Sequence, residues 1–495
     1  MDERKISGHI KDNIAIMETY YKDCADIKKK QMKLGKNKDV EAYLIFIEVA
    51  VSAGTSSLGE TLKFLNERNR EEIEASLMAN ALGISDATYF ATVQEAVDGL
   101  LTGEAILFVD GFDKAVKIPD KGYPSKGISA SESEKVVRGS NEALCESVKL
   151  NAALIRKRIR SSKVKARQVR AGLRSNTNIY LMYIEDLVKP ELLHEIEKRL
   201  EGFEIDGVLD SGILEQLSEE KWYSPFPQFQ TTERPDRAAM ALLEGRVVLL
   251  SDNSPVGLLL PTDYNSFLKT ADDYYNRFEV ASFARMIRYV ASFFALTLPG
   301  FYLAFTNFHT QILPTSLLLK FAEARVGVPF PAVIEILLME LSFELLREAG
   351  VRLPGVMGNT IGIVGGLIIG QSAVEAGLVS PIVVIVIAFT ALCSFSIPNE
   401  EFASAFRLLK FVLIGLSAWL GYFGMLTGLL FILIHLSHLN SFGNPYLTPF
   451  VGADLNQYQD ERDVMWRLPL RFLKRRPIYA NEKETLKLRL KNKRG

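Results

Sequence analysis

Apolar residues are concentrated in the second half of the chain, where they form three runs without a charged residue. The first run covers 289–308, and its twenty positions are enough for a helix to cross a hydrocarbon core of about 30 Å at about 1.5 Å per residue. The others cover 378–397 and 411–441. The last run is long for one upright helix, so it tilts, breaks near Gly421 and Gly424, or forms two crossings. The second half is therefore predicted to be a helical transmembrane region.

A regular series of glycines lies within this apolar half. Gly358, Gly362, Gly366 and Gly370 follow one another at four-residue spacing, so they share one face of a helix. Small residues at this spacing let two helix backbones approach closely, which matters in lipid because no hydrophobic force drives helices together there. The series predicts a tight helix–helix contact, for which a seam between subunits is one interpretation.

The segment 330–348 is apolar but contains charged residues, which are Glu335, Glu340, Glu344, Arg347 and Glu348. Three of the glutamates recur at four-residue spacing and share one helical stripe, whereas Glu335 points elsewhere. A carboxylate that faces lipid at mid-depth costs about 2.5–3.5 kcal/mol, so these glutamates cannot all face lipid. Two arrangements stay open: an amphipathic helix in the interface with its stripe toward water, or copies of the helix around a water-filled path that favours cations.

The first half repeats a pattern at a separation of about 140 residues. The segment YLIFIE at 43–48 resembles YLMYIE at 180–185, and LLTG at 100–103 resembles LLEG at 242–245. A strand, a tight turn and a second strand are predicted after both LLTG and LLEG. Helical stretches lie between these strands. The repeat predicts two α/β subdomains of similar build, with a boundary near Ser162.

These patterns divide the chain into five parts. They are an N-terminal helical lead at 1–40, a first α/β subdomain at 41–162, a second at 163–280, a transmembrane region at 281–450 that includes the carboxylate-bearing amphipathic helix at 330–348, and a basic tail at 451–495. Arg285 and Arg288 precede the first apolar run and hold that end in the cytoplasm by the positive-inside rule. The N-terminal half and the tail then lie on the cytoplasmic side, which requires an even number of crossings, and about four are expected.

Overall composition hides this division, because the 495 residues carry a formal net charge of only −1. Residues 467–495 hold eleven Lys and Arg against two Glu, so the preceding residues carry −10. The basic tail is expected to contact anionic lipid headgroups. Three scattered cysteines do not form a disulfide framework, and the N-terminus lacks the pattern of a secretory signal.

Residues with catalytic or cofactor-binding signatures are not recognisable in the sequence. No glycine-rich phosphate loop follows a strand, and no nucleophile motif occurs. His435 and His438 share a helix face, but a metal site would need a nearby thiolate or carboxylate. We therefore expect no enzyme activity, no cofactor, no metal and no nucleic-acid partner. Two dense charged clusters, by themselves typical of solvated turns and helix starts, contain Arg138, Gly139, Glu233, Arg234, Pro235 and Asp236.

Several segments occur in the order that is typical of one protein family. They are VVRGSNEAL at 136–144, NAALIRKRIRS at 151–161, SPFPQFQTTERPDRAA at 224–239, LLEGRVVLLSDNSP at 242–255, DDYYNRF at 272–278, the carboxylate-bearing segment at 327–354, IVGGLIIGQSAVEAG at 363–377 and HLSHLNSFGNPYLTP at 435–449. Together they resemble the A subunit of the GerA-type spore germination receptors; a sister branch in the stage V sporulation group shares some motifs. Ser140 and Leu144 depart from the family pattern near Arg138, which weakens any role for that loop.

The resemblance implies a non-enzymatic membrane subunit in the inner membrane of a dormant spore, with the N-terminal domain facing the core. It implies a transporter-like, nutrient-binding B subunit and a lipoprotein C subunit as partners. It also implies that the A subunit forms a homo-oligomer with a nutrient-gated cation path. The glutamates of 330–348 and Arg347 match the charged motif of the family and are candidates for the pore or its gate. Two alternatives stay open, namely a non-conducting scaffold and a secondary transporter.

Overall fold

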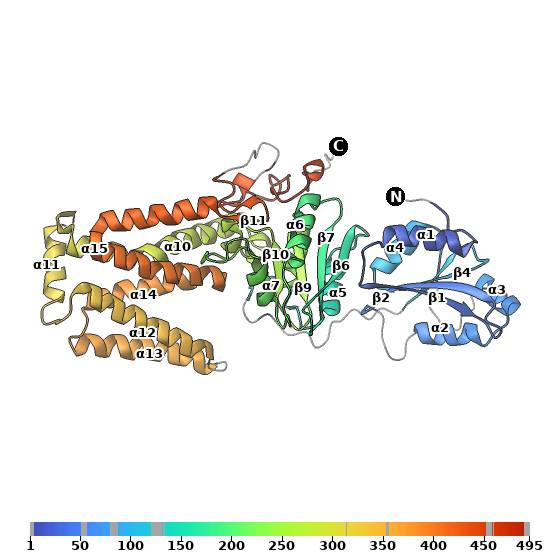
Figure 1. The fold of residues 1–495 in the computed structure, drawn as a ribbon, viewed down its shortest axis with the longest axis horizontal. Helices are drawn as coiled ribbons and strands as arrows, with labels where there is room; N and C mark the ends of the chain where they lie inside the picture. Colours follow the sequence, from blue (N-terminus) through green and yellow to red (C-terminus); the bar gives the residue numbers. More distant parts are fainter. Residues whose placement is uncertain are drawn as a thin grey trace.

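The computed structural model describes three regions that follow one another along its long axis, two sheets and a bundle of helices (Figure 1). The described residues are 4–50, 57–79, 88–119, 131, 134–312, 314–352, 356–451, 458 and 460–489.

The first sheet has five antiparallel strands in the order β1-β2-β4-β5-β3. Its strands are β1 (Ile27–Leu34), β2 (Val40–Ile47), β3 (Thr88–Phe90), β4 (Ala105–Val109) and β5 (Ala115–Ile118), and its helices are α1 (Ile10–Tyr20), α2 (Ser57–Asn66), α3 (Arg70–Met78) and α4 (Val93–Leu101). Alternate side chains of a strand point to opposite faces, so Tyr43 and Ile45 pack with α1 and α4, whereas Ala42 and Leu44 pack with α2 and α3. Helices therefore cover both faces.

The second sheet also has five antiparallel strands, in the order β6-β7-β9-β10-β8. Its strands are β6 (Val164–Ala171), β7 (Thr177–Ile184), β8 (Gln230–Thr232), β9 (Val247–Ser251) and β10 (Gly257–Leu260), and its helices are α5 (Val148–Arg158), α6 (Pro190–Leu200), α7 (Ser211–Ser218) and α8 (Pro235–Leu243). Residues of α5 and α8 pack on one face, and residues of α6 and α7 on the other. Strand order and helix placement thus match those of the first sheet.

Two boundaries differ from those predicted from the sequence. The segment 1–40 was expected to be a helical lead, but α1 and β1 are parts of the first sheet unit, because Ile10, Met17 and Ile27 are buried in its core. The helix α5 precedes the expected boundary at Ser162, yet it packs on the second sheet. The apolar sides of α1 and α5 fit their own sheets, which local sequence patterns do not reveal.

A buried ion pair joins the two sheet units. Arg156 of α5 donates two hydrogen bonds to Asp26, one of them at 3.0 Å, and the side chains are only 1 % and 3 % exposed. Next to this pair, the backbone of Ala25 donates to Ala166 of β6 at 2.9 Å. The contact therefore combines a charge pair with backbone hydrogen bonds.

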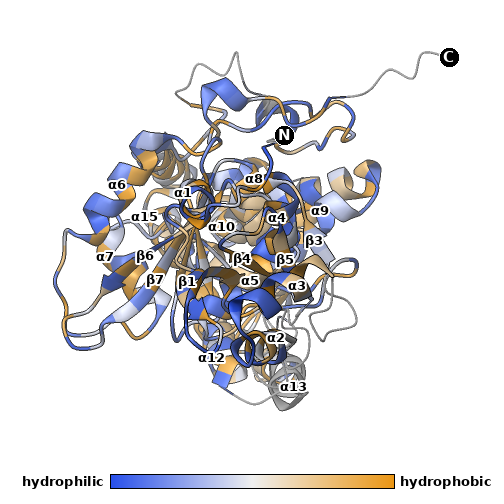
Figure 2. Ribbon diagram, turned by 90° about the vertical axis from the view of Figure 1, so that its right-hand side faces the viewer, coloured by the Kyte–Doolittle hydropathy of each residue, from blue (hydrophilic) through white to orange (hydrophobic). Residues whose placement is uncertain are grey.

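The third region is helical and begins after a short connection. It contains η1 (Tyr264–Phe267), α9 (Asp272–Tyr275), α10 (Phe278–Asn307), η2 (Thr310–Ile312), α11 (Thr315–Ala324), α12 (Ala332–Arg352), α13 (Val356–Glu375), α14 (Pro381–Phe395) and α15 (Glu400–His438). Among the described residues, α10 and α15 are long and apolar enough to cross a membrane, and α14 is a shorter apolar helix. On α15, Trp419, Phe423 and Phe431 are 76 %, 69 % and 66 % exposed. By contrast, α1, α3 and α6 carry many hydrophilic residues (Figure 2). The helical region thus presents apolar side chains outward.

Helix α15 is a hairpin rather than one rod. Gly421 has φ +60° and ψ −138°, a left-handed conformation that interrupts the helix. The second leg folds back on the first, because Ser417 Oγ lies 3.4 Å from Met425 Sδ and the side chain of Leu413 lies against Gly428. The long apolar run therefore breaks at Gly421, as one of the three alternatives predicted, and the two antiparallel legs that result fit the two-crossing alternative as well.

The C-terminal segment packs on the second sheet unit instead of extending away from it (Figure 1). It follows the short strands β11 (Asn440–Ser441) and β12 (Asn444–Pro445) and contains η4 (Asp460–Arg462) and η5 (Glu482–Glu484). Asn481 donates to the carbonyl of Leu187 at 2.8 Å, and Ala480 lies so close to Gly245 that a side chain at that glycine would clash. The backbone of this basic segment thus has partners on the protein, and contact of its side chains with lipid headgroups stays a prediction.

Candidate functional site

The two charged clusters that the sequence singled out come together beside the second sheet. Pro235 starts α8, and Arg234 just before it binds the Asp236 carboxylate at 2.8 and 3.1 Å. Tyr275 also donates to Asp236, at 2.8 Å. Burial opposes ionisation, but the hydrogen bonds from Arg234 and Tyr275 hold the pKa of Asp236 below its ordinary value. Sequence reading treated these residues as solvated turns, whereas Arg234 is only 3 % exposed.

The loop that carries Arg138 and Gly139 joins the same cluster. Arg234 donates to the carbonyl of Ser140 at 3.0 Å. The backbone N–H of Arg138 donates to Asp272 at 3.2 Å, while its side chain is exposed. Gly139 has φ +143°, and a Cβ there would lie 3.0 Å from the ring of Tyr275. The glycine is therefore required by conformation and by close packing. Glu233 accepts a hydrogen bond from Ser131 at 2.8 Å.

A second group of charges connects this region to the first long helix. We call it the junction cluster, which consists of Lys269, Asp273, Arg285, Arg288, Asp463 and Arg467. Arg285 of α10 is fully buried and binds Asp273 at 3.1 Å and Asp463 at 2.7 Å. Arg288, one turn further on, also binds Asp273. The junction cluster thus ties three segments that are far apart in sequence: the connection before α10, α10 itself and the C-terminal segment.

Electrostatics at Asp463 favour the ionised carboxylate. Burial opposes ionisation, but Lys269 at 3.5 Å, Arg285 and the hydroxyl of Tyr274 at 2.5 Å lower the pKa of Asp463 to about 2. Arg467 exchanges hydrogen bonds with Ser282 of α10 at 3.0 and 3.1 Å. The C-terminal segment is therefore held to the start of α10 by charge and by directional bonds.

A third group of charges lies inside the helical region. We call it the helix cluster, which consists of Glu340, Glu344, Arg347, Glu400, Arg407 and Lys410. Glu340 is 1 % exposed and accepts a hydrogen bond from Lys410 at 2.5 Å. Glu344 lies 3.3 Å from Arg407 and 3.8 Å from Lys410. Two of the three glutamates of the stripe, Glu340 and Glu344, thus face cations on α15 and not lipid.

The remaining charged candidates of α12 lie outside this cluster or at its edge. Arg347 binds Glu400 at the start of α15 at 2.8 Å. Glu348 is exposed and pairs with Arg352 on its own helix at 2.5 Å. Glu335 does point elsewhere, as predicted: it is fully buried, lies 3.2 Å from Arg325 and accepts the backbone N–H of Ser380 at 2.8 Å. Only Glu348 has the water-facing position of an interfacial helix.

The glycine series lies on α13, whose surroundings are described only in part. Gly358 and Gly362 belong to the helix, but what surrounds them lies outside the described residues. Gly366 is exposed, and a Cβ there would meet no described atom within 4 Å. A Cβ at Gly370 would meet Val384 of α14 at 3.4 Å. The described part of the series therefore has one contact with α14 and one open position.

Two sets of residues were not found from the sequence. They are the cations that pair with the glutamates of α12, and the carboxylate that pairs with Arg285. Arg407 and Lys410 stand three residues apart at the edge of an uncharged run, and this spacing could have indicated partners for a carboxylate stripe. Asp463 gave no such signal, because it lies 178 residues from Arg285. No group of three or more His, Cys, Asp or Glu able to hold a metal occurs in the described part of the chain.

A large α/β region joined to helices that are long and apolar enough to cross a bilayer is typical of membrane proteins with an extramembrane domain. The chain belongs to the Bacillus/Clostridium GerA spore germination protein family, whose family model matches residues 15–479.

Relatives match over nearly the whole chain. It is 36 % identical to spore germination protein A1 of Bacillus subtilis over 98 % of this chain and 99 % of that protein. It is 34 % identical to spore germination protein KA of the same species, over 97 % and 88 %, and 37 % identical to the membrane protein YfkQ, over 96 % and 92 %. The crystal structure of the N-terminal domain of the A subunit of the Bacillus megaterium spore germinant receptor GerK3 aligns with a TM-score of 0.40 at 25 % identity, over 53 % of this chain and 98 % of that one.

Proposed function

We propose that this protein is the A subunit of a membrane receptor that senses a nutrient and starts spore germination. In this proposal it assembles as a homo-oligomer with a transporter-like B subunit and a lipoprotein C subunit in the spore inner membrane. Its helical region forms a cation path that opens when the nutrient binds. Family membership and the apolar helices support the receptor assignment, and the buried charges of α12 support the path.

The packing of the C-terminal segment supports an even number of crossings. Asn481 contacts the second sheet unit and Asp463 contacts Arg285 at the start of α10, so both ends of the helical region lie on the same side. Helix α10, helix α14 and the two legs of α15 account for four crossings. Helices α12 and α13 pack against each other as a pair, which adds two crossings or none. We assign both ends to the cytoplasm or spore core.

The single observation that carries the cation path is the set of buried carboxylates on α12. Lys410, the partner of Glu340, directly precedes the uncharged run 411–441 of α15, so this pair lies at the edge of the apolar part of that helix. Oε1 of Glu340 is buried and has neither a hydrogen bond nor an ion pair among the described residues, whereas Oε1 of Glu335 lies 3.2 Å from Arg325 and Oε1 of Glu344 lies 3.8 Å from Lys410. Buried acceptors of this kind are stabilised by water or by a cation. A conformational change that separates α12 from α15 would let the carboxylates of Glu340 and Glu344 bind water or a cation instead of Lys410 and Arg407.

The double variant Glu340→Gln, Glu344→Gln is expected to slow nutrient-triggered cation release by about tenfold or more, because a charge-assisted contact is worth about 1.5–3 kcal/mol. The measurement is potassium release from spores after nutrient addition, at matched receptor abundance in the inner membrane. Glu348→Gln is the control, since Glu348 is exposed and pairs only on its own helix among the described residues. Unchanged release and selectivity in the double variant would refute a conducting role for these glutamates.

A non-conducting scaffold is the second candidate, and the helix cluster itself favours it. Lys410 neutralises Glu340 within one chain, and a pair of this kind can serve packing alone. Purified chain in a planar bilayer separates the two candidates. A conducting subunit gives a current that the double variant changes, whereas a scaffold gives none.

Assembly through the glycine series is tested by Gly366→Leu. Because no described atom lies within 4 Å of the Cβ position, the change is expected to leave the fold of a single chain intact and to reduce the mass of the detergent-solubilised complex. Light scattering gives that mass. Gly300→Leu is the matched control: its Cβ would lie 2.9 Å from both Met425 and Ser417, so it lowers the stability of the chain itself. A Gly366→Leu complex of unchanged mass would remove the glycine seam from the proposal.

A further inference from the structure

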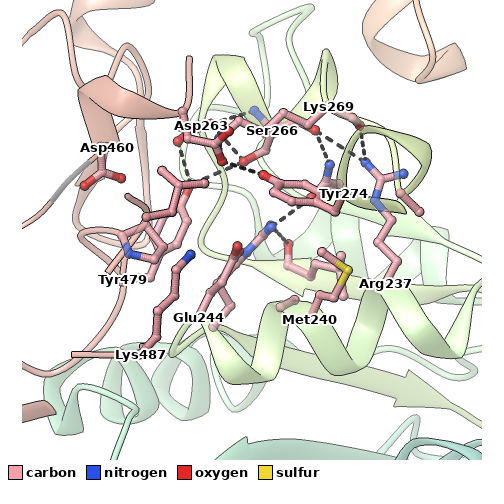
Figure 3. A pocket seen from close by; sticks show the side chains of 18 of the residues that line it. Arg237, Met240, Glu244, Asp263, Ser266, Lys269, Tyr274, Asp460, Tyr479 and Lys487 are labelled. Atoms are coloured by element: carbon pink, nitrogen blue, oxygen red, sulfur yellow. Dashed lines mark hydrogen bonds and ion pairs between the residues drawn. The ribbon is translucent and has the colours of Figure 1, made fainter. Parts of the chain in front are cut away.

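A cavity of about 80 Å³ lies between the second sheet unit and the C-terminal segment (Figure 3). Glu244 and Arg246 line it from the connection between α8 and β9, and Asp460, Tyr479 and Lys487 line it from the C-terminal segment. One water needs about 10–15 Å³ by this kind of measure, so the cavity has room for a solute of several heavy atoms. The connection before α10 also lines it, through Asp263, Lys269 and Tyr274 among others, so a bound solute would bridge the C-terminal segment to both other parts of the wall.

Arg246 is a buried guanidinium that forms no ion pair with a carboxylate among the described residues. It is 4 % exposed, and its two hydrogen bonds go to neutral acceptors, Gln230 Oε1 at 2.9 Å and the carbonyl of Leu259 at 3.4 Å. Its Nε has no hydrogen-bond partner among the described residues. The ring of Tyr479 lies 5.3 Å from the guanidinium. A buried charge is normally paired, so an uncompensated positive charge marks this wall of the cavity.

Asp460 and Glu244 supply the opposite sign. Among the described residues neither carboxylate forms an ion pair, and Asp460 accepts only the backbone N–H of Ile478, at 3.1 and 3.4 Å. The Lys487 ammonium likewise has no ion pair there, and Figure 3 shows Lys487, Asp460 and Glu244 around the same space.

The other charged residues of the wall, Arg475 among them, already have interactions of their own. Asp463 is bound by Lys269 and Arg285, Arg237 is bound to Glu134, and Asp263 accepts hydrogen bonds from Tyr479 at 2.7 Å and from Ser266 at 2.6 and 2.8 Å.

Unmatched charges of both signs therefore face one cavity without pairing across it. We propose that the cavity binds a small zwitterionic solute, whose anionic group is held by Arg246 and Lys487 and whose cationic group is held by Asp460 and Glu244. A solute with only one charge would leave the groups of the other sign unmatched. Because the site is made by the C-terminal segment together with the other parts of the wall, the bound solute also strengthens the docking of the C-terminal segment.

The geometry gives this site a pH dependence. The charged groups that interact with Asp460 are Asp263, Lys269 and Glu244, and Lys487 lines the same cavity. Burial, followed by the nearby Asp263, raises the pKa of Asp460 to about 7, although Lys269 and the N–H of Ile478 oppose the shift. Below pH 7 the carboxyl is neutral and holds an ammonium group weakly. Binding is therefore expected to strengthen between about pH 6 and pH 8.

The test uses the purified full chain in detergent and three probes of similar size: glycine, acetate and methylammonium. Equilibrium dialysis is expected to show saturable glycine binding, with acetate and methylammonium at least about tenfold weaker. Acetate binding as tight as glycine binding would overturn the proposal in favour of a simple anion site. The absence of saturable glycine binding would mean that the cavity holds water alone.

Two variants link the binding to these residues. Asp460→Asn keeps the shape of the side chain and is expected to weaken glycine binding about tenfold and to abolish its rise near pH 7. Lys487→Gln, at an exposed position, is expected to weaken binding without a risk to folding. Glu484→Gln is the control, because it changes a charge in the same segment away from the cavity. Equal binding by all three variants would refute the site. The result is independent of ion conduction, so this inference and the proposed function stand or fall separately.

Discussion

Lys410→Met is expected to lower the free energy of unfolding of the solubilised chain by about 3–5 kcal/mol, because it leaves a buried carboxylate without its partner. Glu340 is 1 % exposed, and its only hydrogen bond from a described cation comes from Lys410. Glu344 lies 3.8 Å from the same ammonium but keeps Arg407 at 3.3 Å, so Glu340 is the carboxylate that loses its cation. Denaturant titration in detergent, followed by helical circular dichroism, gives the stability change.

The double variant Glu340→Met, Lys410→Met removes both charges, so it tests whether the loss of stability in Lys410→Met comes from the unpaired carboxylate. Two apolar side chains of similar volume are expected to return the stability to within about 1–2 kcal/mol of the original chain. Arg352→Met is the control, since its pair with Glu348 is exposed and is worth about 0–1 kcal/mol. If Lys410→Met and Arg352→Met lower the free energy of unfolding by the same amount, the Lys410 ammonium is not buried against α12.

Arg285→Met, at the start of α10, is also expected to lower the free energy of unfolding by about 3–5 kcal/mol. The change leaves Asp463 and Asp273 without their shared cation, although Asp273 keeps Arg288 and Asp463 keeps Lys269. Because Asp463 holds the C-terminal segment, we also expect that segment to be cut by a protease at concentrations that leave the original chain intact. Mass spectrometry of the fragments identifies the cut.

The pH dependence of this contact follows from the depressed pKa of Asp463. A carboxyl with a folded-state pKa of about 2 contributes stability that is fully present above its unfolded value near 4 and is lost as the pH falls toward 2. The Asp463→Asn variant is expected to lose that contribution at neutral pH, and its free energy of unfolding is expected to fall less steeply as the pH is lowered from about 4 to about 2. If the protease cuts the C-terminal segment of Arg285→Met no more readily than that of the original chain, the segment is not anchored through the junction cluster.

Local patterns predicted the order of the regions, because apolar runs and turn residues report on nearby structure. The strands at 43–48 and 180–185 occupy the second place in their respective sheets, and the two sheets have the same strand order. Equal strand order is what an internal duplication gives, and the duplication itself stays a prediction. Gly421 was correctly singled out as a break in the long run.

Long-range partners were not predictable. Glu340 and Lys410 are 70 residues apart, and nothing in the spacing of either segment specifies that α12 faces α15. The same holds for Arg234: its neighbours Asp236 and Pro235 suggest a helix start, but Tyr275 and the loop at Gly139 are brought there by tertiary folding. The basic composition of the tail predicts contact with lipid headgroups, but composition does not reveal that the backbone of this segment also has partners on the second sheet unit.

The docking of residues 460–489 has a consequence for the biosynthesis of this protein. Arg285 leaves the ribosome long before Asp463 is made, so during synthesis this arginine enters the membrane boundary with half of its final carboxylates. A chain that ends after α15 contains all the apolar helices and both sheets, yet Arg285 then keeps only Asp273 and Lys269 loses its ion pair with Asp463. We therefore expect the start of α10 to be less stable in such a chain than in the complete chain.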